Sequence, residues 1–137
     1  MTTVIISQAA LLIWFWGCIT TYRIGKLTLV EGMGIKSAEF VMLCVFISGC
    51  ILYHSFHSVG RWVLLAILLL WFIVQFFCHW YFTIFGASKK KLESYNSCFK
   101  NTIRLLPKNE KRIVPDFYHI VLHILIVLNI VCCLVYI

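Results

Sequence analysis

The sequence predicts an all-α membrane protein with four transmembrane helices, on three observations. Hydrophobic residues make up 62% of the 137-residue chain and charged residues only 12%, whereas soluble domains carry roughly 25% charged residues. Four apolar runs are each long enough to cross a bilayer. The lysines and arginines lie almost entirely in two of the segments between these runs. Together these observations predict a single polytopic membrane domain over residues 1–137 and leave no room for a separate soluble domain.

The four expected spans are residues 4–22, 40–58, 62–85 and 117–137. Each is close to the ~20 residues that a ~30 Å hydrocarbon core requires. We expect helices because a spanning segment must satisfy its own backbone hydrogen bonds in lipid. The connection over residues 23–38 contains three glycines, which indicate an irregular loop.

The distribution of basic residues predicts the orientation of the spans. Eleven of the 12 lysines and arginines lie in the loops after the first and third spans, and only Arg61 lies between the second and third. Cytoplasmic loops carry the excess of basic residues in membrane proteins. We therefore expect both of these loops to be cytoplasmic and both chain termini to lie outside, in a bacterial inner membrane or an organelle inner membrane.

Residues 89–106 are expected to form an amphipathic helix on the cytoplasmic membrane surface, ended by Pro107. Its apolar residues recur at offsets of three and four: Leu92, Tyr95, Phe99, Ile103 and Leu106. Its basic residues are expected to contact anionic lipid headgroups: Lys89, Lys90, Lys91, Lys100 and Arg104. Because the basic residues lie between apolar runs, the net charge of +7 does not indicate a nucleic-acid partner.

The segment VPDFYHIVLH, residues 114–123, holds the first group of candidate site residues. On a helix, Asp116, His119 and His123 stand at offsets of three, four and seven, so they share one face. Ionisable groups within a membrane span are by default candidates for a functional site. Pro115 and Asp116 are also a common helix opening, because proline presets φ and an aspartate complements the helix dipole.

The third span offers a matching stripe. Gln75, His79 and Thr83 are spaced by four and must face the protein interior or water. His79 and His123 each lie seven residues from the cytoplasmic end of their span, or about 10 Å deep. Since consecutive antiparallel spans are usually neighbours, these two rings are expected to meet. Glu39 stands at the cytoplasmic start of the second span.

Two further histidines, His54 and His57, lie at the outer end of the second span. An imidazole is comfortable in the headgroup region, where its polar edge reaches water. We expect both rings to lie at the outer interface.

The histidines on the cytoplasmic side admit two kinds of cofactor. A haem b needs two imidazoles from facing helices, which His79 with His123 or His119 can supply. A zinc or iron site needs three or four nitrogen and oxygen ligands. The candidates for such a site are His79, His119, His123, Asp116 and Glu39. The alternative is structural: these histidines act as hydrogen-bonding groups between helices and bind no cofactor.

The sequence thus leaves two functions open. The first is a small integral membrane protein whose histidine cluster binds a metal ion or haem for redox or hydrolytic chemistry near the cytoplasmic side. The alternative is a non-catalytic structural or assembly subunit of a larger membrane complex. Aromatic residues at 16% provide a large surface for lipid, for other membrane subunits or for a second copy of the chain.

Overall fold

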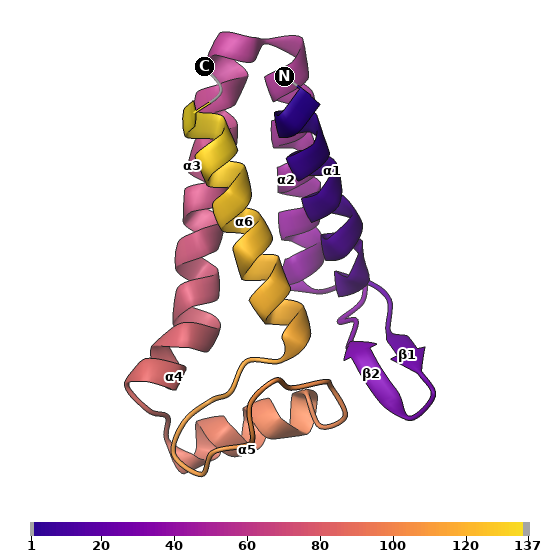
Figure 1. Cartoon of the computed structure of the whole chain (residues 1–137), viewed down its shortest axis with the longest axis vertical. Coiled ribbons are helices and arrows are strands. Elements are labelled where there is room, and N and C mark those ends of the chain that lie inside the picture. The colour runs from indigo at the N-terminus through magenta and orange to yellow at the C-terminus, as the bar shows by residue number, and fades with distance from the viewer. Residues whose placement is uncertain (1, 136–137) are drawn as a thin grey trace.

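A computed structural model describes residues 2–135 of the chain, and it is mostly helical. Four long helices run alternately up and down in Figure 1, with α1 and α6 in front of the α2–α3 pair. Their bounds are α1 Thr2–Phe15, α2 Ala38–Ser55, α3 His57–Gln75 and α6 Phe117–Val135. A short 3-10 turn, η1 (Trp16–Cys18), extends α1, while a π-helical turn, η2 (Phe76–Trp80), and α4 (Tyr81–Ile84) extend α3. We call the end where α2 joins α3 the hairpin end and the opposite end the α5 end.

Three helical segments are long and apolar enough to cross a membrane: Ala38–Ser55, the continuous run His57–Ile84, and Phe117–Val135. Thr2–Cys18 is apolar but shorter. The last three expected spans are therefore confirmed as apolar helices of membrane-spanning length. The second ends three residues earlier than expected, at Ser55, and the third begins five residues earlier, at His57. The last two residues of the fourth expected span lie outside the described residues.

The first expected span differs most, because helical structure ends at Cys18 instead of residue 22. Gly17 packs closely here, since a Cβ on it would lie 3.1 Å from Cγ1 of Val30 and 3.4 Å from Cε2 of Tyr118. The chain then enters a β-hairpin. The end of the helix thus packs against Val30 of the β-hairpin.

The connection between the first two spans is more ordered than expected. It folds into an antiparallel hairpin of β1 (Tyr22–Ile24) and β2 (Leu27–Val30). Gly25 supplies the positive φ of +63° that the tight turn needs. The expectation of an irregular loop was thus wrong for residues 23–30.

The amphipathic helix α5 (Lys89–Cys98) lies across the α5 end, as Figure 1 shows. It ends eight residues before the expected boundary at residue 106. The carbonyl of Phe99 accepts hydrogen bonds from the Thr102 hydroxyl and the Arg104 guanidinium, which closes the chain into a turn. Thr28 on β2 then pairs with the backbone of Asn101 and Ile103, so this segment is extended.

The core is formed by all four long helices. Trp71 is buried in it, with its ring centroid 4.2 Å from that of Phe15 and 5.7 Å from that of Phe46. At the hairpin end, α2 and α3 approach closely at Gly60, where a Cβ would lie 2.3 Å from the carbonyl oxygen of Leu52. A second, smaller cluster of Leu92, Tyr95 and Ile113 joins α5 to the chain that leads into α6.

Candidate functional site

The π-helical turn η2 positions His79. This turn interrupts the regular α-helix between α3 and α4, and the His79 ring is 7% exposed. A π-turn adds a residue to one helical turn and is frequent at functional sites. Gln75 and His79 are both buried, which confirms that their stripe faces inward.

His79 is held from both its backbone and its ring. The Thr83 hydroxyl contacts the carbonyls of His79 and Ile113, at 3.1 and 2.8 Å. The ring Nδ1 lies 3.0 Å from the hydroxyl of Tyr95 on α5. The backbone N–H of Asp116 also contacts the phenol oxygen but can only donate. We therefore assign the Tyr95 O–H as donor and the Nδ1 of His79 as its acceptor. Nε2 of His79 then carries the proton.

His119 is oriented by Asp116, which precedes α6 and is 1% exposed. Oδ1 of Asp116 accepts hydrogen bonds from the backbone N–H of His119, at 3.1 Å, and from its ring Nδ1. The first bond caps the helix, as the helix-opening interpretation of Asp116 expects. The second bond selects the tautomer, because in a neutral ring the proton lies on Nδ1 and Nε2 is the acceptor.

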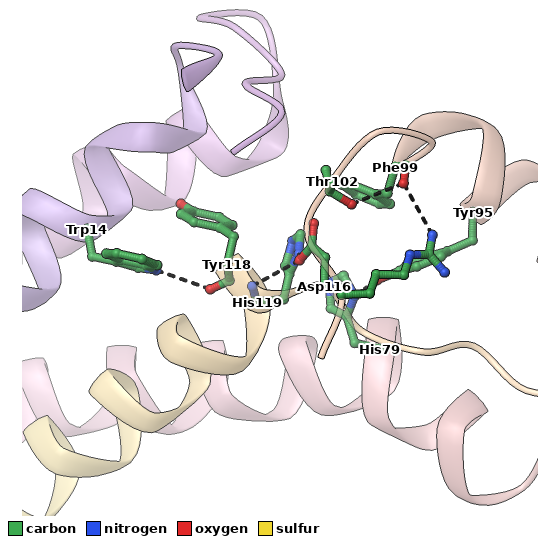
Figure 2. Close-up of polar contacts among 9 residues, drawn as sticks. Trp14, His79, Tyr95, Phe99, Thr102, Asp116, Tyr118 and His119 are labelled. Atoms are coloured by element: carbon green, nitrogen blue, oxygen red, sulfur yellow. Dashed lines mark hydrogen bonds and ion pairs between the residues drawn. The ribbon is translucent and has the colours of Figure 1, made fainter. Parts of the chain in front are cut away.

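The two histidines lie against each other, as Figure 2 shows. Their ring centroids are 4.0 Å apart with an interplanar angle of 33°. Phe99 meets the His119 ring edge-on at 5.2 Å. The pair therefore joins the extended α3, the start of α6 and the α5 segment at one point.

The Asp116 carboxylate and the Tyr95 phenol, which contact the pair, are both buried. Oδ2 of Asp116 is buried and has no hydrogen-bond partner among the described residues. Burial raises the pKa of the Tyr95 phenol well above its usual value, and the negative charge of Asp116 raises it further. Tyr95 is therefore a neutral hydrogen-bond donor throughout the physiological pH range.

This arrangement limits which cofactors the pair can hold. Both Nδ1 atoms are engaged, which leaves both Nε2 atoms for a ligand: Nε2 of His119 as an acceptor and Nε2 of His79 as a donor. However, no group of three or more His, Cys, Asp or Glu residues in the described part of the chain is arranged to hold a metal ion. The rings contact each other, so no porphyrin fits between His79 and His119.

A pocket of about 360 Å³ opens beside the histidine pair, between α2, the extended α3 and α5. Its polar lining includes Glu39, Gln75, His79, Lys91, Tyr95 and His119. Its apolar lining includes Phe15, Met42, Leu70, Trp71, Val74 and Phe99. Pockets of roughly 300–1,000 Å³ that are mostly apolar, with a few polar groups, are typical of small-molecule sites.

The structure brings together only some of the residues expected at the site. His79, His119 and Asp116 converge, and Glu39 lines the same pocket. The ring of His123 instead packs against Phe72 and Trp80, with centroids 4.6 and 5.8 Å away, and its Nδ1 has no partner. His119 thus takes the place beside His79 that the depth comparison gave to His123.

Tyr95 is the residue that sequence reasoning missed. It was expected only as part of the apolar face of the amphipathic helix. A signal was present, because a tyrosine on a buried face needs a partner for its hydroxyl. The identity of that partner depended on how α5 packs.

At the hairpin end, the histidines are arranged differently. His54 is exposed, and its Nε2 lies 2.8 Å from Oε1 of Gln8 on α1. His57 is also exposed and meets Tyr53 edge-on. Neither ring is fixed by a carboxylate in the described residues.

Comparison with family models, curated proteins and solved structures gives no match.

Proposed function

We propose that the chain is an integral membrane protein of four spans, with the α5 end on the cytoplasmic side and both chain ends outside. Three helices of spanning length support this topology, together with the basic residues gathered at the α5 end. The shorter α1 packs along α6, where Nε1 of Trp14 donates to the Tyr118 carbonyl at 3.1 Å. Asn129 of α6 bonds the Ser7 carbonyl of α1 at 2.9 Å.

Labelling of Cys98 with a membrane-impermeant maleimide tests the orientation. Cys98 is exposed on α5, so it should react in inside-out vesicles and be protected in right-side-out vesicles. The reverse pattern would overturn the topology.

We further propose that the histidine pair is a binding site whose His119 acts as a general base in hydrolytic or related proton-transfer chemistry. One observation carries this proposal: Asp116 binds Nδ1 of His119, while Nε2 remains free at a pocket that His119 lines. A carboxylate in this position fixes the tautomer and stabilises the imidazolium that forms when Nε2 takes a proton. Such a base contributes about 10²–10⁴-fold to a rate.

The test is acylation of histidines by diethyl pyrocarbonate, followed by mass spectrometry of each site. An unprotonated and accessible Nε2 should make His119 react readily. Asp116→Asn keeps an acceptor for the helix cap but removes the charge, so it should slow acylation of His119 and leave His57 unchanged. An inert His119, or an equal rate in Asp116→Asn, would contradict the proposed base.

The second candidate is a transition-metal site, zinc or iron, using the same two Nε2 atoms. The contacts at Nδ1 favour it, because metal-binding histidines usually donate the N–H of their second ring nitrogen to a protein group. For His79, metal binding requires the other tautomer, in which the Nδ1–H donates to the Tyr95 hydroxyl oxygen and Nε2 carries no proton. Metal analysis of the detergent-purified protein tests it. One zinc or iron per chain, lost in both His79→Ala and His119→Ala, would establish it, and a metal-free protein that still acylates at His119 favours the base. A colourless, metal-free and unreactive protein that co-purifies with fixed partners would favour a non-catalytic subunit.

A further inference from the structure

The lining of the pocket beside the histidine pair changes from apolar to polar along the axis of α3. Its lining passes from Leu70, Trp71 and Val74 to Gln75 and His79, moving toward the α5 end. Leu70 and His79 are nine residues apart, or roughly 13 Å along a helix. A molecule that fills the pocket therefore meets an apolar wall at one end and hydrogen-bonding groups at the other.

The apolar end of the pocket opens to the outer surface of the helices. Leu70 is 60% exposed and Val74 is 48% exposed, yet both line the pocket. In a four-span protein, that surface faces acyl chains. A ligand can then enter sideways from the bilayer, with its chain along Leu70 and Val74.

The polar end has no net positive charge to hold an anionic head group. The positive charge of Lys91 is matched by Glu39 on the same lining, and the Asp116 carboxylate adds a negative charge behind the neutral His119 ring. Nε2 of His79 is a donor because the Tyr95 hydroxyl donates to its Nδ1, whereas Nε2 of His119 is an acceptor. A donor and an acceptor side by side match a hydroxyl group, which both accepts and donates a hydrogen bond.

We propose that this pocket binds a single-chain lipid with an uncharged, hydroxyl-bearing head, either a monoacylglycerol or a long-chain alcohol. The head lies at the His79–His119 pair and the chain follows Trp71 and Val74 toward the hairpin end. A pocket of about 360 Å³ suits one chain better than the two chains of a bilayer phospholipid. This inference rests on the proposed histidine site and names its ligand class.

Tryptophan quenching by brominated lipids tests the inference. The probes are a monoacylglycerol, a long-chain alcohol and a fatty acid, each brominated in mid-chain and added to protein in nanodiscs of unbrominated phosphatidylcholine. We expect saturable quenching with the monoacylglycerol, the alcohol or both, and which one saturates identifies the head. The anionic fatty acid should give only quenching that grows in proportion to its mole fraction.

Two pairs of variants test whether the saturable quenching arises from a lipid bound in this pocket. Trp71→Phe should remove the saturable component, whereas Trp62→Phe, on the exposed surface of α3, should retain it. His119→Ala should weaken binding about tenfold, as expected for loss of one hydrogen bond of ~1.4 kcal/mol, and the exposed His57→Ala should leave it unchanged. Quenching in strict proportion to mole fraction for every probe, or tighter binding of the fatty acid, would overturn the inference.

The two proposals fail in different ways. If His119 is acylated as expected but no probe saturates, the lipid inference falls and the base stands. If a probe saturates but His119 is inert to diethyl pyrocarbonate, the base falls and the lipid site stands.

Discussion

The two ends of the α2–α3 pair contrast sharply, although the same two helices form both. At the hairpin end, Gly60 brings the backbones of α2 and α3 into contact, and His54 and His57 remain on the surface. At the α5 end, the helices are separated by a pocket. His79 is buried and His119 half-buried beside it, and both Nδ1 atoms are engaged. The contrast indicates that the separation of the helices, rather than the presence of histidines, makes a site.

The largest loss of stability is expected from a substitution at Gly60, where α2 and α3 touch at the hairpin end. In Gly60→Ala, the new Cβ would lie 2.3 Å from the Leu52 carbonyl oxygen, so the backbones must move apart. We expect the free energy of unfolding in detergent to fall by about 3 kcal/mol, the upper range for overpacking. Ala66→Val, on the exposed face of α3, is the control and should change little. An unchanged free energy of unfolding in Gly60→Ala would show that α2 and α3 do not pack backbone to backbone at Gly60.

A smaller loss is expected at the α5 end from His79→Ala. This substitution leaves the buried Tyr95 hydroxyl without its partner, which costs roughly 1–3 kcal/mol. The matched change His57→Ala removes an exposed ring and should cost within ~0.5 kcal/mol. Equal losses in the two variants, measured by thermal unfolding in detergent, would erase the distinction between the two ends.

Two substitutions of Asp116 separate its role as a helix cap from its charged contact with the His119 ring. Asp116→Ala should cost about 1 kcal/mol of stability, because the N–H of His119 loses its cap. Asp116→Asn should retain most of that stability, since its amide oxygen still accepts the hydrogen bond. Unfolding of both variants under one detergent condition tests this, and a loss in Asn as large as in Ala would mean that the charge matters more than the cap.

A pH dependence of stability is expected at Tyr95. Its pKa in the folded protein is raised, so folding favours the protonated phenol. The resulting stability is complete below the unfolded pKa of about 10 and is lost as pH rises through the folded pKa. Between pH 9 and 11, wild type should therefore lose more stability than Tyr95→Phe. Identical pH profiles would show that Tyr95 is not buried as the α5 packing requires.

Much of this architecture follows from the sequence. Apolar run lengths predict the three long helices, and the spacing of Gln75 and His79 predicts their inward face. The β-hairpin was not predictable because its strands are short and carry exposed apolar residues. The end of α5 at Cys98 depends on backbone pairing between Thr28 and residues 101–103, which are far apart in sequence.

The site was predictable as a set of residues but not as a set of partners. Depth along each helix placed His79 level with His123. The π-turn at Phe76–Trp80 changes the direction of the His79 side chain, and the cap by Asp116 fixes His119. Neither a π-turn nor the packing of Tyr95 on His79 leaves a periodic signal in the sequence.

The central claim, that His119 presents a bare Nε2 at the pocket, is tested most directly by nitrogen NMR. Protein with ¹⁵N-labelled histidine in nanodiscs would be recorded at pH 8, with His119→Ala to assign the signal. The expected result is a neutral His119 ring protonated at Nδ1 and unprotonated at Nε2, with this preference weakened in Asp116→Ala. A His119 ring protonated at Nε2 and bare at Nδ1 would contradict the claim.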